Sequence, residues 1–118
     1  MYGAQMVTMN VTIPNGAAVP TAGIDLSGFV LCGVQMPAAW TAANLTFQGA
    51  GDALANAANV YDSSGTEYTV TASTSRFIQI SPADFIGVKY LVVRSGTAGT
   101  PVNQGADRVI TLVLRDLK

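Results

Sequence analysis

The stretch that decides the fold class is VTMNVTI, residues 7–13, in which apolar and polar residues alternate without interruption. Successive side chains of a β-strand point to opposite faces, so this alternation predicts a strand with one face toward a core. Pro14-Asn15-Gly16 then ends the strand, because proline lacks a donor for the sheet and Asn-Gly favours a turn. The sequence therefore predicts a half-buried strand here.

Strand signals separated by turn residues recur along the rest of the chain. Residues 28–36 are a nearly continuous apolar run, which is typical of a strand buried on both faces. Other strands are predicted at residues 45–48, 60–61, 67–71, 76–80, 88–94 and 108–114, with a short one inside 17–26. We expect four phenylalanines of these segments in the core: Phe29, Phe47, Phe77 and Phe85.

Three connecting segments carry local signals. Asp62-Ser63-Ser64-Gly65 predicts a hairpin turn between residues 60–61 and 67–71. Ser81 as a cap and Pro82 at the first position predict one helical turn over residues 81–85. The alanine-rich residues 49–59 have no helical stripe, so we expect a loop.

About eight short strands without any long helix predict an all-β chain. The 118 residues suffice for one ordinary core, so we expect a single β-sandwich domain of the jelly-roll type over residues 1–118. The strand order does not follow from the sequence.

The composition is poor in charge. Charged residues make up 11% of the chain, whereas about a quarter is usual, which indicates a surface partly covered by further copies or by a partner. The net charge of -1 and the scattered cationic residues argue against a nucleic-acid partner. We expect no membrane segment, because no apolar run reaches about 18 residues. We also expect no signal peptide, and synthesis in a cytoplasm.

The residues for catalysis are missing or isolated. Histidine is absent, which removes the usual general base, metal ligand and Ser-His or Cys-His pair. Nearly all of the seven acidic residues lie in or beside turns, where Asp stabilises the backbone locally. Residues 62–67 superficially suggest a calcium loop, but a hairpin turn is the better interpretation. The single cysteine, Cys32, is interpreted as a small buried hydrophobe. We therefore predict no enzyme activity, no metal and no cofactor.

The order of segments in the C-terminal three quarters resembles a known family. The segments are WTAANLTFQ (40–48), RFIQISPADF (76–85), KYLVVRSGT (89–97), PVNQ (101–104) and RVITLVLR (108–115). Over residues 26–116 they are similar to small virion proteins of tailed bacteriophages and gene-transfer particles, whose fold resembles the discoidin-like jelly roll. Residues 49–59 depart from that pattern. The resemblance implies a capsid decoration (cement) protein or the base of a head fibre, located in the virion and made in the host bacterial cytoplasm.

The resulting hypothesis is a non-enzymatic protein that binds the outer surface of the major capsid protein and self-associates, as a homotrimer. The N-terminal strand or arm (residues 1–14) and the loop over residues 95–107 are the expected contact segments. The candidate contact residues are Tyr2, Met6, Val7, Met9, Trp40, Thr97, Pro101, Asn103 and Gln104.

Two alternatives stay open. A carbohydrate-binding module or host-recognition spike would stack a glycan on an exposed Trp40 or Tyr61. A tail or neck component of the same virion would need the same stable sandwich, so the sequence does not separate it from a head protein.

Overall fold

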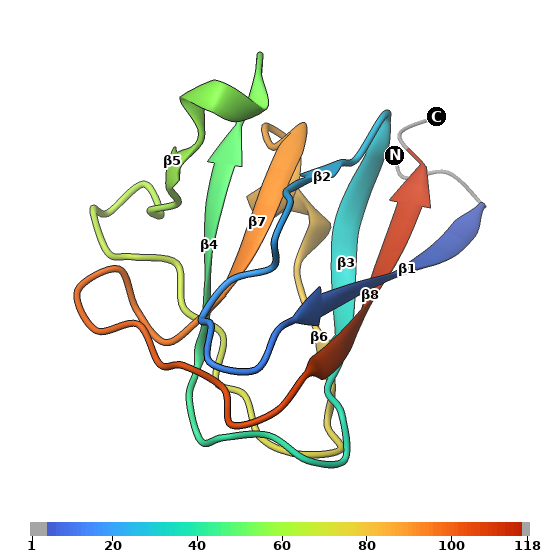
Figure 1. Cartoon of the computed structure of the whole chain (residues 1–118). Helices are drawn as coiled ribbons and strands as arrows, with labels where there is room; N and C mark the ends of the chain where they lie inside the picture. Colours follow the sequence, from blue (N-terminus) through green and yellow to red (C-terminus); the bar gives the residue numbers. More distant parts are fainter. Residues whose placement is uncertain (1–4, 117–118) are drawn as a thin grey trace.

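A computed structural model describes residues 5–116, and its eight strands form two four-stranded antiparallel sheets (Figure 1). The first sheet has the order β1-β8-β3-β6, with β1 at Met6–Ile13, β8 at Arg108–Asp116, β3 at Phe29–Gln35 and β6 at Phe77–Gln79. The second has the order β2-β7-β4-β5, with β2 at Ile24–Asp25, β7 at Tyr90–Ser95, β4 at Leu45–Ala50 and β5 at Ala58–Asn59. Two short 3₁₀ turns, η1 (Leu54–Asn56) and η2 (Pro82–Phe85), complete the elements.

The strand pairing confirms the predicted jelly-roll sandwich. Along the chain the first strand pairs with the last, β2 with β7, β3 with β6 and β4 with β5. The pairs β1–β8 and β3–β6 lie in one sheet, and β2–β7 and β4–β5 lie in the other. This is the connectivity of a long hairpin folded over itself into two packed layers, as in a jelly roll.

The alternation in residues 7–13 sets the orientation of β1. Val11 and Ile13 are buried in the core, whereas Thr8, Asn10 and Thr12 are exposed on the outer face. All eight residues of β1 pair with β8 without a register shift. The predicted one-sided strand is therefore confirmed.

The core between the sheets is one hydrophobic cluster with an aromatic centre. Phe47 and Phe85 meet edge to face with ring centroids 5.2 Å apart, and Phe85 meets Tyr68 in the same way at 5.1 Å. Such T-shaped arrangements bring the positive edge of one ring to the negative face of the next. Phe47 and Phe85 thus occupy the core as predicted, and Phe29 is half-buried against it.

The expectation for Phe77 is wrong. Its side chain is 55% exposed on the outer face of the first sheet, where its ring lies over Gly33. Phe77 shares that face with Gln79, while Ile78 and Ile80 point the other way and are the more buried pair.

Two secondary-structure predictions are corrected. Residues 49–59 are not only a loop, because they contain the end of β4, η1 and β5. Asp52 organises η1 by accepting hydrogen bonds from the Ala53 N–H at 2.7 Å and the Asn56 side chain at 2.9 Å. Residues 67–71 form no strand; their β-type pairing consists of single bridges, Glu67 with Tyr61 and Val70 with Leu45.

The turn predictions are partly confirmed. The hairpin turn forms around Asp62, whose carboxylate accepts the N–H groups of Ser64 at 2.9 Å and Thr66 at 3.0 Å. η2 begins with Pro82 as expected, but the Ser81 side chain makes no capping hydrogen bond, so the predicted cap is wrong. The backbone carbonyl of Ser81 instead accepts the Asp84 N–H at 3.1 Å.

Candidate interaction surface

Four acidic side chains of the described chain, Asp25, Asp52, Asp62 and Asp107, bond to backbone N–H groups of turns. Within residues 5–116, no group of three or more His, Cys, Asp or Glu side chains is placed to hold a metal ion. Asp25 accepts the Ser27 N–H at 2.9 Å, and Asp107 accepts the Asn15 N–H at 2.8 Å. At Asp52, the hydrogen bond from the Ala53 backbone, aided by that from Asn56, lowers the pKa of the carboxyl. These acidic residues therefore stabilise the backbone of turns, as expected from their positions in the sequence.

A buried ion pair closes the outer face of the second sheet. Arg94 on β7 donates to Glu67 at 2.8 Å, and the two side chains are only 8% and 17% exposed. The same guanidinium donates to Thr46 and to Asn59, both at 2.9 Å. Glu67 also accepts the Ala98 N–H at 3.0 Å. The network ties β4, β5 and the loop after β7 together, and it leaves little of either charge for an outside ligand.

A second polar centre surrounds Gln104. Its side chain is 1% exposed, accepts the Thr41 N–H at 2.8 Å, and donates to the Thr41 carbonyl at 3.0 Å and to Ser95 at 2.8 Å. Arg108 donates to the same amide oxygen at 3.2 Å. The Gln104 side chain therefore joins its own loop to the loop at Thr41, the end of β7 and the start of β8.

The outer face of the first sheet, by contrast, carries an apolar hollow. The hollow has a volume of about 440 Å³ and is lined by Met6, Cys32, Phe77, Gln79, Pro82, Val113 and Arg115. Met6 and Phe77 are 52% and 55% exposed, although both are large and hydrophobic. We call this set of residues the outer hollow. Exposed apolar side chains gathered around a depression are typical of a contact surface for another macromolecule.

Cys32 forms part of the floor of the outer hollow. The register between β3 and β8 shifts between Leu31 and Gly33, which leaves Cys32 as an unpaired bulge residue. Its thiol is half-buried and donates to the Val113 carbonyl at 3.4 Å. Desolvation by burial raises the pKa of the Cys32 thiol, with Arg115 acting in the opposite direction. Cys32, predicted as a small buried hydrophobe, is therefore only partly covered.

The second feature of this side is the free edge of β1. The Asp116 N–H donates to the Gln5 carbonyl at 3.2 Å, so position 5 belongs to the hydrogen-bonded set of the β1–β8 ladder. Because antiparallel pairs alternate, the odd positions bond to β8 and the even ones direct N–H and C=O to the opposite edge. Those even positions are Met6, Thr8, Asn10 and Thr12. No strand within residues 5–116 pairs with that edge.

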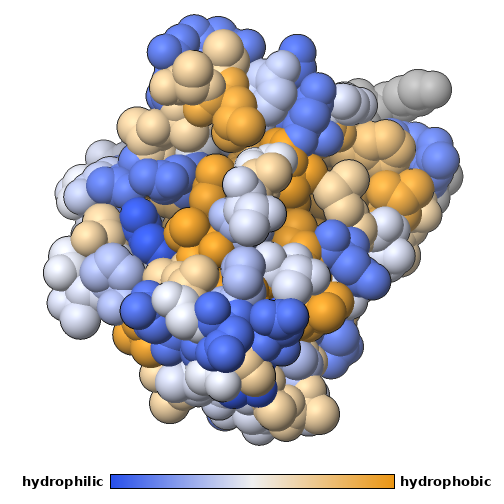
Figure 2. All heavy atoms as spheres, in the orientation of Figure 1, coloured by the Kyte–Doolittle hydropathy of each residue, from blue (hydrophilic) through white to orange (hydrophobic). Residues whose placement is uncertain are grey.

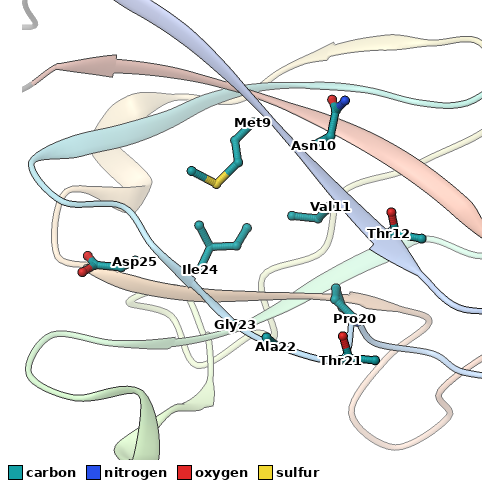
Figure 3. Close-up of a pocket in the computed structure, with 10 residues that line it drawn as sticks. All are labelled: Met9, Asn10, Val11, Thr12, Pro20, Thr21, Ala22, Gly23, Ile24 and Asp25. Atoms are coloured by element: carbon teal, nitrogen blue, oxygen red, sulfur yellow. The ribbon is translucent and has the colours of Figure 1, made fainter.

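A second hollow of about 410 Å³ lies along the same edge, between β1 and the segment that leads into β2. Met9 and Val11 point into it from β1, and Ile24 faces them from β2 (Figure 3). Figure 2 shows hydrophobic atoms gathered at the centre of this view, on both sides of residues 20–25. We call this depression the seam, because it lies where the two sheets part at their β1 and β2 edges.

The structure separates the residues predicted as contacts. Met6 is exposed in the outer hollow, while Val7 and Met9 are half-buried on the inward face of β1. Pro101 and Asn103 are exposed and Thr97 is half-buried, all in the loop after β7. Tyr2 lies outside the described residues.

Two predicted contacts prove to be internal. The Trp40 ring is 9% exposed and donates to the Ala43 carbonyl at 2.9 Å, so it belongs to the core. Gln104 is satisfied within the chain as described above. Sequence reasoning missed Phe77, Cys32 and Val113 as a surface group, because it treated apolar residues in strands as core.

Comparisons with known proteins do not identify the chain: no family model, no curated protein and no solved structure matches it. Among the described residues, no helix has the length and apolar character needed to cross a membrane.

Proposed function

We propose that this chain is a non-enzymatic structural protein of a tailed-bacteriophage virion. It decorates the outside of the capsid, as a cement protein or head-fibre base, and binds the major capsid protein. The jelly-roll sandwich and the resemblance of residues 26–116 support this proposal. The observation that carries it is the outer hollow, a hydrophobic contact surface on a molecule whose buried polar groups are largely satisfied internally.

The physical mechanism is burial of apolar surface against the shell. Phe77 is the anchor, because aromatic side chains at the centre of an interface contribute more binding energy than their neighbours. Met6 and Val113 line the same hollow, and a partner that covers it would exclude water from the Phe77 ring. A chain present in many copies would then link neighbouring capsid subunits without any chemical step.

The test compares two rings of nearly equal exposure. Phe77, 55% exposed, is in the outer hollow, and Tyr61, 54% exposed, is in the loop after β5. In co-sedimentation with empty heads of the virus that encodes the chain, Phe77→Ser is expected to lower the affinity at least about tenfold. Tyr61→Ser is expected to bind as the wild type does.

The same pair of variants tests the carbohydrate-binding alternative. With Trp40 in the core, Tyr61 is the ring that remains for glycan stacking. A glycan signal lost only in Tyr61→Ser would favour that alternative. Wild-type protein that does not sediment with heads, or Phe77→Ser that binds unchanged while keeping its fold, would refute our proposal.

A further inference from the structure

The free edge of β1 differs from the other three sheet edges in length. β1 has eight residues, whereas the edge strands β2, β5 and β6 have two, two and three. Long edge strands invite pairing with another chain, and proteins usually block them with charges, proline or a bulge. β1 has none of these: no residue from Met6 to Ile13 is charged, and the ladder to β8 is regular.

From this geometry we infer that two copies of the chain pair through β1, antiparallel and about a two-fold axis. The occupant of the edge is thus a second β1. This pairing would merge the two first sheets into one continuous sheet of eight strands. The inference is independent of the proposed function, because it concerns the purified chain without any capsid.

The register follows from the direction of the hydrogen-bonding groups. Only even positions offer N–H and C=O at the free edge, so an even position must face an even position. The register that uses all four of them places the axis at Met9, with Met6 opposite Thr12 and Thr8 opposite Asn10 of the second copy. The two-fold axis repeats each of these pairs, so four pairs form. Each pair exchanges two hydrogen bonds, which gives about eight in all.

The side chains are compatible with this register. A two-fold axis perpendicular to the sheet keeps the inward face of one copy continuous with that of the other. Val7 then lies opposite Val11, and Met9 lies opposite its own copy, so the half-buried Val7 and Met9 both gain apolar neighbours. The outward face pairs small polar residues, and no like charges meet because β1 is neutral.

Charge also argues for a second copy over a charged partner. A strand without charged side chains offers no electrostatic selection for an acidic or basic peptide. By contrast, the free edge of β1 is complementary to the same edge of a second copy in hydrogen bonding and polarity. Because such an isologous contact closes at two copies, it predicts a dimer in place of the trimer expected from the sequence.

Cross-linking tests the register directly. In a Cys32→Ala background, Met9→Cys places two thiols opposite each other in a non-hydrogen-bonded pair, with Cα atoms about 4.5 Å apart. This separation is within the range that a disulfide spans. Val7→Cys is the matched control, because it is also half-buried and inward-facing, yet its two copies lie roughly 14 Å apart along the strands. Mild oxidation should yield covalent dimer from Met9→Cys and little from Val7→Cys.

Proline substitution tests the hydrogen bonds. The Thr8 N–H points to the free edge, so Thr8→Pro removes an outward donor and leaves the bonds to β8 intact. Sedimentation equilibrium should show a dimer dissociation constant at least about tenfold higher, because both copies lose the bond. Thr8→Val keeps the N–H and should dimerise as the wild type does, with little dependence on salt. A wild-type monomer or trimer at high concentration, or equal cross-linking of both cysteine variants, would overturn the inference.

Discussion

The outer face of the second sheet is closed by the chain itself, whereas the outer face of the first sheet is left open. On the second sheet, Glu67 and Asn59 reach Arg94 and bury its charge. On the first sheet, Phe77 and Met6 remain more than half exposed around the outer hollow. The long connection from residue 51 to residue 69 supplies the side chains that cover Arg94 on the second sheet.

This difference indicates which residues stabilise the fold and which are available to bind a partner. Polar groups on the closed side are buried, so they are costly to leave without partners and cannot easily rearrange for a ligand. Apolar groups on the open side gain free energy only when something else covers them. Substitutions on the closed side should therefore lower the free energy of unfolding, and those on the open side should mainly change association.

The largest effect is expected at the buried ion pair between Arg94 and Glu67 on the second sheet. Glu67→Ala leaves the Arg94 guanidinium buried without its anion, which should lower the free energy of unfolding by about 3–5 kcal/mol. Arg94→Ala should cost a similar amount, and the double variant should cost less than the sum, because both changes remove one interaction. Urea denaturation measures all three. Arg76→Ala is the control: Arg76 is exposed, and its change should stay within about 0.5 kcal/mol. If Arg76→Ala and Arg94→Ala lowered the free energy of unfolding equally, the contrast between the two sheets would be contradicted.

An intermediate effect is expected at Gln104, whose buried side chain joins several segments of the chain. Gln104→Ala removes a buried amide that bonds to Thr41, Ser95 and Arg108, so it should lower the free energy of unfolding by about 2–3 kcal/mol. Asn103→Ala, at the exposed neighbouring position, should be nearly neutral. Thermal denaturation of the two variants separates them. If Asn103 were the more sensitive residue, Gln104 would not hold the loops as described.

The smallest effect concerns Tyr68, which lies in the connection from residue 51 to residue 69 and packs against Phe85 in the core. Burial, together with the hydrogen bond to Asp84 at 2.8 Å, raises the pKa of Tyr68 to about 12. Tyrosine in an unfolded chain titrates near pH 10, so the stability that Tyr68 contributes is complete below about pH 10 and is lost as the pH rises toward 12.

Ultraviolet absorbance during an alkaline titration should show a tyrosine ionising near pH 12 that is missing from Tyr68→Phe. Tyr68→Phe should lack the corresponding fall in unfolding free energy between about pH 10 and 12. A wild-type and a Tyr68→Phe protein with the same alkaline slope would show that Tyr68 is not protected by its surroundings.

Local patterns predicted most of the strands. The alternation of residues 7–13 and the apolar runs at 28–36 and 108–114 placed β1, β3 and β8 to within two residues. The short strand β5 could not be predicted, because alanine and asparagine carry no strand signal and β5 forms by pairing with β4. Glu67 looked like part of a strand, and only its approach to Arg94 makes it the partner of a buried charge.

The candidate surface was harder to predict than the strands. The sequence indicated the N-terminal strand as a contact segment, but it placed Phe77 in the core and Trp40 and Gln104 among the contacts. Hydrophobicity alone does not tell which face of a strand is covered, and a polar side chain such as Gln104 can be buried when several loops meet around it.

By itself, the sequence determined an all-β sandwich without histidine, since alternation and composition depend only on the order and kinds of residues. Tertiary structure decided the rest: which strands pair, which outer face the chain covers, and which edge stays free. Those features depend on contacts between residues far apart in the chain, such as β1 with β8, and no local pattern encodes them.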